Sequence, residues 1–194
     1  DLSHYSSATT DVEYHFPFGW KELEGIADRG NYDLSQHTKH SGKDLAVFDE
    51  ETKESYIPSV VECSVGVDRL FLALMCDAYA EEEVDGETRV LLKLNPAIAP
   101  ITAAIIPLSK KLSEPAKKIY NSLKFKFSVQ YDESGSIGKR YRRQDEIGTP
   151  LCFTYDFESE DDNMVTVRER DTTKQTRIPI DSIEEYIVNT LKKS

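Results

Sequence analysis

The sequence predicts an α/β protein in two parts, residues 1–85 and residues 86–194. Three observations support this division. The first part contains short stretches in which apolar and polar residues alternate, as in an antiparallel sheet, and one long amphipathic run typical of a helix. The second part alternates strand-like with helix-like stretches, which is typical of a mixed sheet covered by helices. The charge also changes, from 6 basic and 19 acidic residues in the first part to 18 basic and 16 acidic residues in the second.

In the first part, the pattern predicts short strands joined by polar turns, and two helices. Residues 32–45 have the polarity of a helix, and the helix is expected to stop at Gly42, because glycine readily takes the left-handed conformation that ends helices. A second helix is expected from Val67 to Glu83, with its apolar residues facing a core. The acidic run Glu81–Glu83 indicates either a solvated joint between the two parts or the polar end of that helix. The strands are expected over residues 11–18, 20–29, 46–49, 54–58 and 57–62, the last of them buried.

In the second part, the predicted order of elements is β-α-β-α-β-β-β-α. Ser113 is expected to cap the first helix, with Pro115 in its first turn. The next helix is expected to be entered through Gly135 and ended by Gly148. The strands are expected over residues 101–109, 125–132, 151–157, 164–170 and 175–180, and the helices over residues 113–124, 135–148 and 181–194.

Composition restricts the class of protein. The 194 residues are 39% hydrophobic and 30% charged, which is ordinary for a soluble globular protein that can bury a core. No apolar stretch reaches the roughly 18 residues that span a bilayer. Cys63, Cys76 and Cys152 have no paired spacing, so we expect no disulfide framework and a reducing compartment. His37 and His40 are the only close histidine pair, and we expect no metal site there.

Three stretches, in order along the chain, resemble one enzyme family. The segment "VVECSVGVDRLFLALMCDAY" resembles motif 3 of the class II aminoacyl-tRNA synthetases, in particular the dimeric, bacterial-like glycyl-tRNA synthetases. Upstream, "TTDVEYHFPFGWKELEGIADRGNYDLSQH" is similar to the segment that precedes motif 3 in that family. Downstream, "DESGSIGKRYRRQDEIGTPLCFTYDF" is similar to the anticodon-binding domain of the glycyl, histidyl, prolyl and threonyl enzymes. The resemblance implies that residues 1–85 are the C-terminal part of a catalytic domain and residues 86–194 an anticodon-binding domain.

The resemblance also implies an activity and its partners. Glycine–tRNA ligases activate glycine with ATP to glycyl-adenylate and transfer it to tRNA(Gly). Motifs 1 and 2 of the family would lie N-terminal to Asp1, so we expect this chain to be inactive alone. The resemblance further implies Mg²⁺ beside ATP, a homodimer for the full-length enzyme, no membrane association and a cytoplasmic location. The alternative is a non-catalytic tRNA- or RNA-binding protein derived from a synthetase.

The same resemblance assigns roles around residues 62–69. Arg69 matches the motif 3 arginine that stacks on adenine and faces the phosphates, and it is the predicted catalytic residue. Glu62 matches a position that holds the ammonium group of glycine. Cys63 stands where family members usually have proline, and we interpret it as a packing residue. Glycine contacts are expected from Glu62, Cys63, Ser64, Val65 and Gly66, and ATP contacts from Glu22, Leu23, Gly66, Val67, Asp68 and Arg69.

The residues taken alone leave simpler interpretations open. Glu62 and Arg69 could form a structural ion pair with each other. Arg29 could be a loop charge that pairs with Asp28, and Glu22 an ordinary acidic residue of a polar loop. These alternatives differ in their contacts, so a structure can separate them.

A basic segment in the second part predicts an RNA site. Residues 110–143 carry 10 basic and 3 acidic side chains, and four of the cations fall in the helix that follows Gly135. Backbone amides at that helix start could meet phosphate, and RNA loops are usually read through stacked, unpaired bases. The alternative is a solvated basic face neutralised by Asp145 and Glu146. The predicted tRNA-binding residues are Lys139, Arg140, Arg142, Arg143, Arg168, Arg170 and Gln175.

Overall fold

The computed structural model describes residues 6–84 and 86–193. Its contacts divide the chain into two compact units, the first ending at Cys76 and the second beginning at Asp77. The border between the compact units therefore precedes the predicted boundary at residue 85. The reason is that residues 79–84 pair with residues 87–92 as two antiparallel strands, the second of which packs on a helix of the second unit. The division into a catalytic part and an anticodon-binding part concerns function and stays a prediction.

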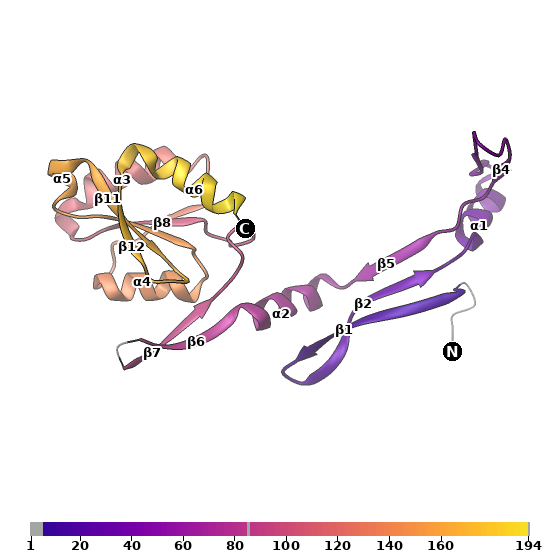
Figure 1. The fold of residues 1–194 in the computed structure, drawn as a ribbon, viewed down its shortest axis with the longest axis horizontal. Helices are drawn as coiled ribbons and strands as arrows, with labels where there is room; N and C mark the ends of the chain where they lie inside the picture. Colours follow the sequence, from indigo (N-terminus) through magenta and orange to yellow (C-terminus); the bar gives the residue numbers. More distant parts are fainter. Residues whose placement is uncertain (1–5, 85, 194) are drawn as a thin grey trace. The chain divides into compact units, whose positions relative to one another are not determined.

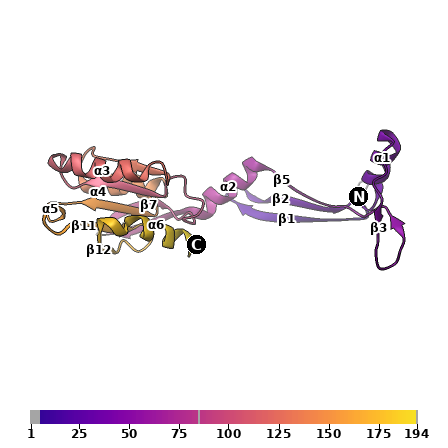
Figure 2. The ribbon, with the colours of Figure 1, turned by 90° about the horizontal axis from the view of Figure 1, so that it is seen from above.

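The first unit contains a three-stranded antiparallel sheet in the order β1-β2-β5, whose strands lie side by side in Figures 1 and 2. Helix α1 (Tyr32–Ser41) ends at Gly42, whose φ of +70° lies in the left-handed region, as predicted. The predicted pair of short strands around a polar turn is confirmed. The strands of this unit are β1 (Ala8–Phe16), β2 (Gly19–Asp28), β3 (Val47–Phe48), β4 (Ser55–Tyr56) and β5 (Val61–Val65).

Helix α2 (Val67–Ala78) is shorter than predicted. The chain turns into strand β6 (Tyr79–Val84), which pairs with β7 (Glu87–Leu92) in an antiparallel hairpin. The acidic run is therefore not a helix end, since it lies in β6, where Glu81 and Glu83 are exposed to solvent. Glu82 accepts a hydrogen bond from Arg89 at 2.9 Å and pairs with Lys93 at 2.7 Å, and these contacts override its helix propensity.

The apolar side chains where β5 meets α2 are largely exposed, which corrects the prediction of a buried strand. All five residues of β5 are exposed, with Val61 at 65% of its full accessible surface. On α2, Val67 is 79% and Phe71 63% exposed, whereas Ala73 is buried. The periodicity gave the helix correctly, but the described chain holds no element that covers this apolar face.

The second unit is built on a five-stranded mixed sheet in the order β12-β11-β10-β8-β9. β8 runs parallel to both β9 and β10, and β11 runs antiparallel to β10 and β12. Every residue of β8 and β10 is buried, which fits their continuous apolar sequences. The strands are β8 (Ala103–Pro107), β9 (Val129–Tyr131), β10 (Leu151–Tyr155), β11 (Met164–Glu169) and β12 (Gln175–Pro179).

Helices cover both faces of this sheet (Figure 1), as predicted. One face packs against α3 and α6, which contribute Ala116, Ile119 and Ile187 to the main core. The other face packs against α4, through Ile137 and Tyr141. The helical segments are η1 (Lys110–Leu112), α3 (Ser113–Leu123), α4 (Ile137–Glu146), α5 (Ser159–Asp162), η2 (Ile180–Ser182) and α6 (Ile183–Lys192).

Two local predictions in this unit were wrong. Ser113 is the first residue of α3 rather than its cap, and its hydroxyl donates to a carboxylate oxygen of Glu133 at 2.6 Å. The capping hydroxyl belongs to Ser109, which accepts a hydrogen bond from the amide of Lys111 one turn earlier. The strand expected over residues 125–132 covers only β9, because the chain first continues in turns beyond α3.

Candidate functional site

The first unit contains an open cavity of about 550 Å³ where strand β5 meets helix α2. The cavity brings together two segments that lie 47 residues apart in sequence at Glu22 and Arg69. Of the residues predicted to contact glycine, only Gly66 lines it, and the others follow one another along β5. The lining residues are the six predicted to contact ATP: Glu22, Leu23, Gly66, Val67, Asp68 and Arg69.

A β-bulge brings Leu23 to this cavity. Val12 pairs with Glu24 and Glu13 pairs with Glu22, so Leu23 has no partner on β1. A bulge bends its strand and redirects the neighbouring side chains, and bulges often occur beside active sites. The alternating pattern of β2 gave no sign of this bulge, so the sequence predicted Glu22 and Leu23 as site residues but not the bulge that places Leu23 at the cavity.

Arg69 is exposed and held at one edge only. Its Nη1 donates a hydrogen bond to the backbone oxygen of Glu22 at 2.7 Å. The other guanidinium donors and the planar face therefore stay available to a ligand. A Cβ at Gly66 would lie 3.9 Å from the Arg69 side chain, an ordinary contact, so the packing of the described chain tolerates a side chain there.

Glu62 contacts a different arginine from the one expected for a structural pair. Its carboxylate accepts a hydrogen bond from Nη1 of Arg29 at 2.6 Å, and the same guanidinium donates from Nη2 to Asp33 at 3.0 Å. This hydrogen bond from Arg29 is the main cause that lowers the pKa of Asp33. The simpler pairings of Glu62 with Arg69 and of Arg29 with Asp28 are therefore wrong, because Arg29 orients the Glu62 carboxylate instead.

Strand geometry divides the predicted glycine-binding residues between two faces. Glu62 and Ser64 share one face of β5, and Cys63 and Val65 share the other, because side chains alternate along a strand. Cys63 is an exposed free thiol, which contradicts its interpretation as a packing residue. The described cysteines form no disulfide, since Cys76 and the buried Cys152 are also free thiols.

The cavity offers few ligands for a metal ion. Glu22 and Asp68 contribute its two carboxylates, and Mg²⁺ prefers oxygen ligands. Within residues 6–84 and 86–193, no group of three or more His, Cys, Asp or Glu side chains could hold a metal ion. A magnesium ion would fit here only with additional ligands from phosphate groups and water.

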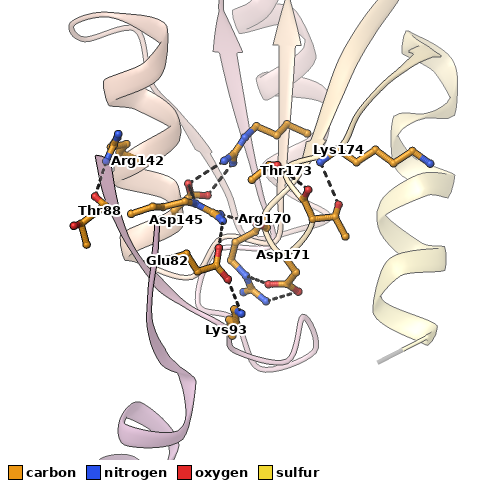
Figure 3. A network of polar contacts seen from close by, with 12 residues as sticks. Glu82, Thr88, Lys93, Arg142, Asp145, Arg170, Asp171, Thr173 and Lys174 are labelled. Carbon is orange, nitrogen blue, oxygen red and sulfur yellow. Dashed lines mark hydrogen bonds and ion pairs between the residues drawn. The ribbon is translucent and has the colours of Figure 1, made fainter. Parts of the chain in front are cut away.

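The second unit contains a buried network of arginines around one carboxylate (Figure 3). Asp145 is 1% exposed and accepts hydrogen bonds from Nε of Arg89 at 2.8 Å and from Nη1 of Arg168 at 2.8 Å. The Arg168 guanidinium also lies 4.9 Å from the ring centroid of Tyr141. Arg170 is 2% exposed and donates to the backbone oxygens of Gly148 and Leu94, both at 2.7 Å.

These contacts give most of the predicted tRNA-binding arginines a structural role. Arg140 is 4% exposed, and its Nη2 donates to the backbone oxygen of Gly135 at 2.6 Å. Arg142 donates to the backbone oxygen of Thr88 at 2.9 Å, and Nε of Arg143 donates to Asp132 at 3.0 Å. The structure does not support Arg140, Arg168 and Arg170 as base contacts, because they are buried and their donors are used within the protein. Asp145 is also removed from the predicted solvated face.

Among the predicted residues, Lys139 and Gln175 are exposed, whereas Arg142 and Arg143 are partly exposed. Lys139 lies on α4, and Gln175 lies on β12. Gln175 also lines a cavity of about 310 Å³ with Tyr141, Arg142 and Thr173. The charge count identified a basic segment, but it could not separate arginines that hold the fold together from cations that face solvent.

A further cavity lies where the parallel strands β8 and β10 end, and the sequence did not predict it. From β8 the chain passes through α3 to β9 on one side, and then through α4 on the opposite face to β10. Ligands of open α/β sheets bind at such a switch point, outside the carboxyl ends of the strands. The cavity has a volume of about 410 Å³ and is lined by Leu108, Asp156, Phe157, Glu158, Thr166 and Arg177.

The walls of this strand-end cavity combine apolar and charged groups. Leu108 is 39% and Phe157 52% exposed, which is unusual beside a well-buried sheet. Arg177 donates to Asp156 and Asp162, with Nη1 to Asp156 at 2.7 Å and Nε to Asp162 at 2.7 Å. An exposed ring beside fixed donors and acceptors suits an unpaired base, which can stack on the ring and present its polar edge.

Comparison with known proteins shows what the chain is similar to. A family described as "Anticodon binding domain" matches residues 102–190, which include β8 to β12. The chain is 64% identical over 192 residues to a glycine–tRNA ligase of Caldanaerobacter subterraneus, covering 99% of this chain and 42% of that protein. It is homologous to the bacterial glycine–tRNA ligases. The match to the anticodon-binding family lies within the second unit.

Further glycine–tRNA ligases match to a similar extent. The identity is 61% over 188 residues with Geobacillus thermodenitrificans, covering 96% of this chain and 40% of the relative. It is 57% over 194 residues with Staphylococcus epidermidis, covering 99% of this chain and 42% of the relative. The chain thus spans about two fifths of the length of these ligases and matches their C-terminal part.

A solved structure has a similar fold. The RNA binding domain of threonyl-tRNA synthetase from Cryptosporidium parvum matches with a TM-score of 0.67 and 19% identity, covering 94% of this chain and 42% of that one. At this identity the likeness concerns the fold alone. Among the described residues, none of the helices has the length and apolar character needed to cross a membrane.

Proposed function

We propose that this chain is part of a glycine–tRNA ligase. In the reaction, the glycine carboxylate attacks the α-phosphate of ATP, glycyl-adenylate forms and pyrophosphate leaves. The glycyl group then passes to tRNA(Gly) and AMP leaves. The observation that carries the proposal is the cavity at the β5–α2 junction, because its lining is the set of residues that the motif 3 resemblance assigns to ATP. The identity of 57–64% to ligases of that name supports it.

The geometry suggests a division of labour in the first unit. Arg69 presents a guanidinium fixed at one edge by Glu22, with its face free for adenine and its remaining donors for phosphate. Glu62 precedes Ser64 by two residues on β5 and is therefore farther from the cavity, which lies at the end of the strand. Arg29 orients the Glu62 carboxylate. That carboxylate is 46% exposed, so it can accept a hydrogen bond from the ammonium group of glycine. Larger amino acids would be excluded from the glycine pocket by steric clash, since a difference of one methyl group in binding contacts is worth only about 1–3 kcal/mol.

The second unit supplies recognition of tRNA in this proposal. The strand-end cavity between β8 and β10 combines an exposed Phe157 with the polar groups of Arg177 and Asp156. Stacking and edge contacts of this kind read unpaired bases of an anticodon loop. Lys139 and Gln175 remain candidate tRNA contacts because both are exposed. A homodimer and a cytoplasmic location accompany the proposal as properties of the full-length enzyme.

The activation step is tested by Arg69→Ala in the full-length enzyme. We expect glycine-dependent exchange of pyrophosphate into ATP to fall by about 10²–10³-fold, as when one preorganised donor to a transition state is removed. Arg69→Lys should not restore the rate, because an ammonium group lacks the planar face and forked donors. The matched control is Lys43→Ala, an exposed residue of the same unit. Unchanged exchange kinetics in Arg69→Ala would contradict the assignment.

The tRNA step is tested by titrating the chain with tRNA(Gly) and with the same tRNA carrying a swapped anticodon. Preference for the glycine anticodon is expected if the second unit reads bases. Phe157→Ala should weaken binding of tRNA(Gly) by about 1–3 kcal/mol, the usual worth of one stacked base. Equal binding of both RNAs by a full-length protein without exchange activity would favour a non-catalytic RNA-binding protein, which the similarity to ligases does not favour.

A further inference from the structure

The two basic helices of the second unit use their charges in opposite ways. The arginines of α4 are engaged within the protein, as Arg140, Arg142 and Arg143 show. The lysines of η1, α3 and the turn after it point to solvent instead. This segment, residues 110–126, carries one acidic residue, Glu114. We call its six cations the α3 lysine face: Lys110, Lys111, Lys117, Lys118, Lys124 and Lys126.

Few carboxylates neutralise the α3 lysine face. Lys126 pairs with Glu184 at 2.6 Å, and Lys117 lies 3.9 Å from Glu114. Among the residues that the structure describes, Lys111 and Lys118 are exposed and lie within 4.0 Å of no carboxylate oxygen. The protein as a whole has a formal net charge of −11, so an exposed cationic face on this helix is a local exception.

The six cations follow one another through three short segments. Lys110 and Lys111 lie in η1, Lys117 and Lys118 lie on α3, and Lys124 and Lys126 lie in the turn directly after α3. The opposite side of α3 is buried, with Ala116 and Leu123 in the core, so Lys118 on this helix is exposed to solvent.

An exposed ring accompanies the cations. Phe125 is 89% exposed, and Nζ of Lys124 lies 5.2 Å from its ring centroid. Exposed aromatic side chains among cations are typical of surfaces that bind nucleic acids, because bases stack on rings while ammonium groups contact phosphates. Lysine suits phosphate contacts without sequence preference, since it acts as a flexible point charge.

We propose that the α3 lysine face binds the phosphate backbone of tRNA outside the anticodon bases. This inference rests on the proposed function, and it assigns the electrostatic part of binding to α3 rather than to α4. Charge complementarity supports RNA as the occupant, because every nucleotide carries one phosphate and the face carries six lysines. The face begins at Lys110, two residues after Leu108, which lines the strand-end cavity, so a backbone lying on it continues toward that cavity.

The test compares two triple variants of the 194-residue chain with equal changes in net charge. The first is Lys111→Gln/Lys118→Gln/Lys124→Gln on α3. The matched control is Lys39→Gln/Lys43→Gln/Lys53→Gln, three exposed lysines of the first unit. Fluorescence anisotropy with labelled tRNA(Gly) at salt concentrations from 50 to 300 mM gives the affinity and its salt dependence. Far-UV circular dichroism confirms that each variant folds.

We expect the α3 variant to bind about tenfold or more weakly at the lowest salt. The slope of log K against log salt should fall by about 2–3, since each lost phosphate contact removes roughly 0.7–0.9. The same loss should appear with an anticodon-swapped tRNA, because phosphates carry no sequence information. Lys111→Arg/Lys118→Arg/Lys124→Arg should restore binding, and the control should bind like the unchanged chain.

The outcomes separate this inference from the proposed function. If the unchanged chain fails to bind tRNA at any salt concentration, the proposed tRNA function of the second unit is wrong. If the unchanged chain binds and the α3 variant binds equally well with the same slope, the inference is overturned while the proposed function stands. An equal loss in the control, or a loss restricted to one anticodon, would also overturn the inference.

Discussion

The two units of this chain bury their apolar residues to very different extents. In the second unit, both faces of the sheet are covered, and Ile105, Phe153 and Val165 are each 1% exposed or less. In the first unit, the amphipathic helix α2 exposes Val67 and Phe71 to solvent, and the strand β5 before it exposes Val61. Since burial of apolar surface is the main source of stability, the second unit should carry most of the stability of the chain. Similar sequence patterns therefore have unequal energetic consequences.

The largest effect that could break this comparison is expected at Asp145. Asp145→Asn leaves Arg168 buried without a compensating charge and leaves Arg89 with Glu82 alone, which should cost about 3–5 kcal/mol of the second unit's free energy of unfolding. Amide hydrogen exchange of β10 and β11 measures that free energy. The control is Glu62→Gln, which removes a partly exposed carboxylate that pairs with Arg29 in the first unit. An equal loss of protection in both variants would contradict the assigned difference between the units.

A pair of apolar truncations sharpens the comparison. Ile105→Ala removes a core side chain of β8 that is 1% exposed, and it should cost about 2–5 kcal/mol through lost burial and a cavity. Phe71→Ala removes a larger side chain from α2, but it should change the stability of this chain by less than about 0.5 kcal/mol, because the ring is 63% exposed. Hydrogen exchange of each unit reports both values. A cost above 2 kcal/mol for Phe71→Ala would show that α2 is packed more tightly than described.

Thiol reactivity compares the units without changing the sequence. Burial raises the pKa of the Cys152 thiol in β10 to about 12, so at pH 8 it carries almost no thiolate and is shielded from reagents. Cys63 in β5 is exposed. Iodoacetamide should modify Cys63 within minutes, whereas Cys152 should react only through opening of the second unit. Peptide mass spectrometry over time measures both rates, and comparable rates would contradict the difference in burial.

A smaller effect is expected from pH at the edge of the second unit. The hydrogen bond from Arg177 is the main cause that lowers the pKa of Asp162 below its usual range. A carboxyl group with a lowered folded-state pKa contributes stability above its unfolded pKa near 4, and this contribution is lost as pH falls through the folded-state value. The stability difference between the unchanged chain and Arg177→Gln should therefore be constant above about pH 5 and shrink toward pH 2. Urea titrations at several pH values measure it, and a difference that grows on acidification would refute the assignment.

The site residues show how far sequence reasoning reached. Motif resemblance named the six residues that line the β5–α2 cavity, because the motif is a contiguous segment together with one upstream pair. It could not place Arg29 on Glu62, which lies 33 residues away. In the second unit, the count of basic residues predicted tRNA contacts on α4 but none from the exposed lysines of residues 110–126. A count of charges contains no information on which side chains are buried.

The sequence by itself determined the order of most strands and helices, without the β6–β7 hairpin and the short helix α5, together with the family resemblance and the segments that carry the candidate sites. These features depend on the period of apolar residues and on contiguous motifs, which are local properties. Only the tertiary structure decided that α2 ends at Ala78, that Leu23 bulges into the cavity, and that Asp145 is enclosed by Arg89 and Arg168. These features depend on partners elsewhere in the chain, which for Asp145 lie 23 and 56 residues away, and the free energy of such contacts outweighs the small local preferences that a sequence pattern records.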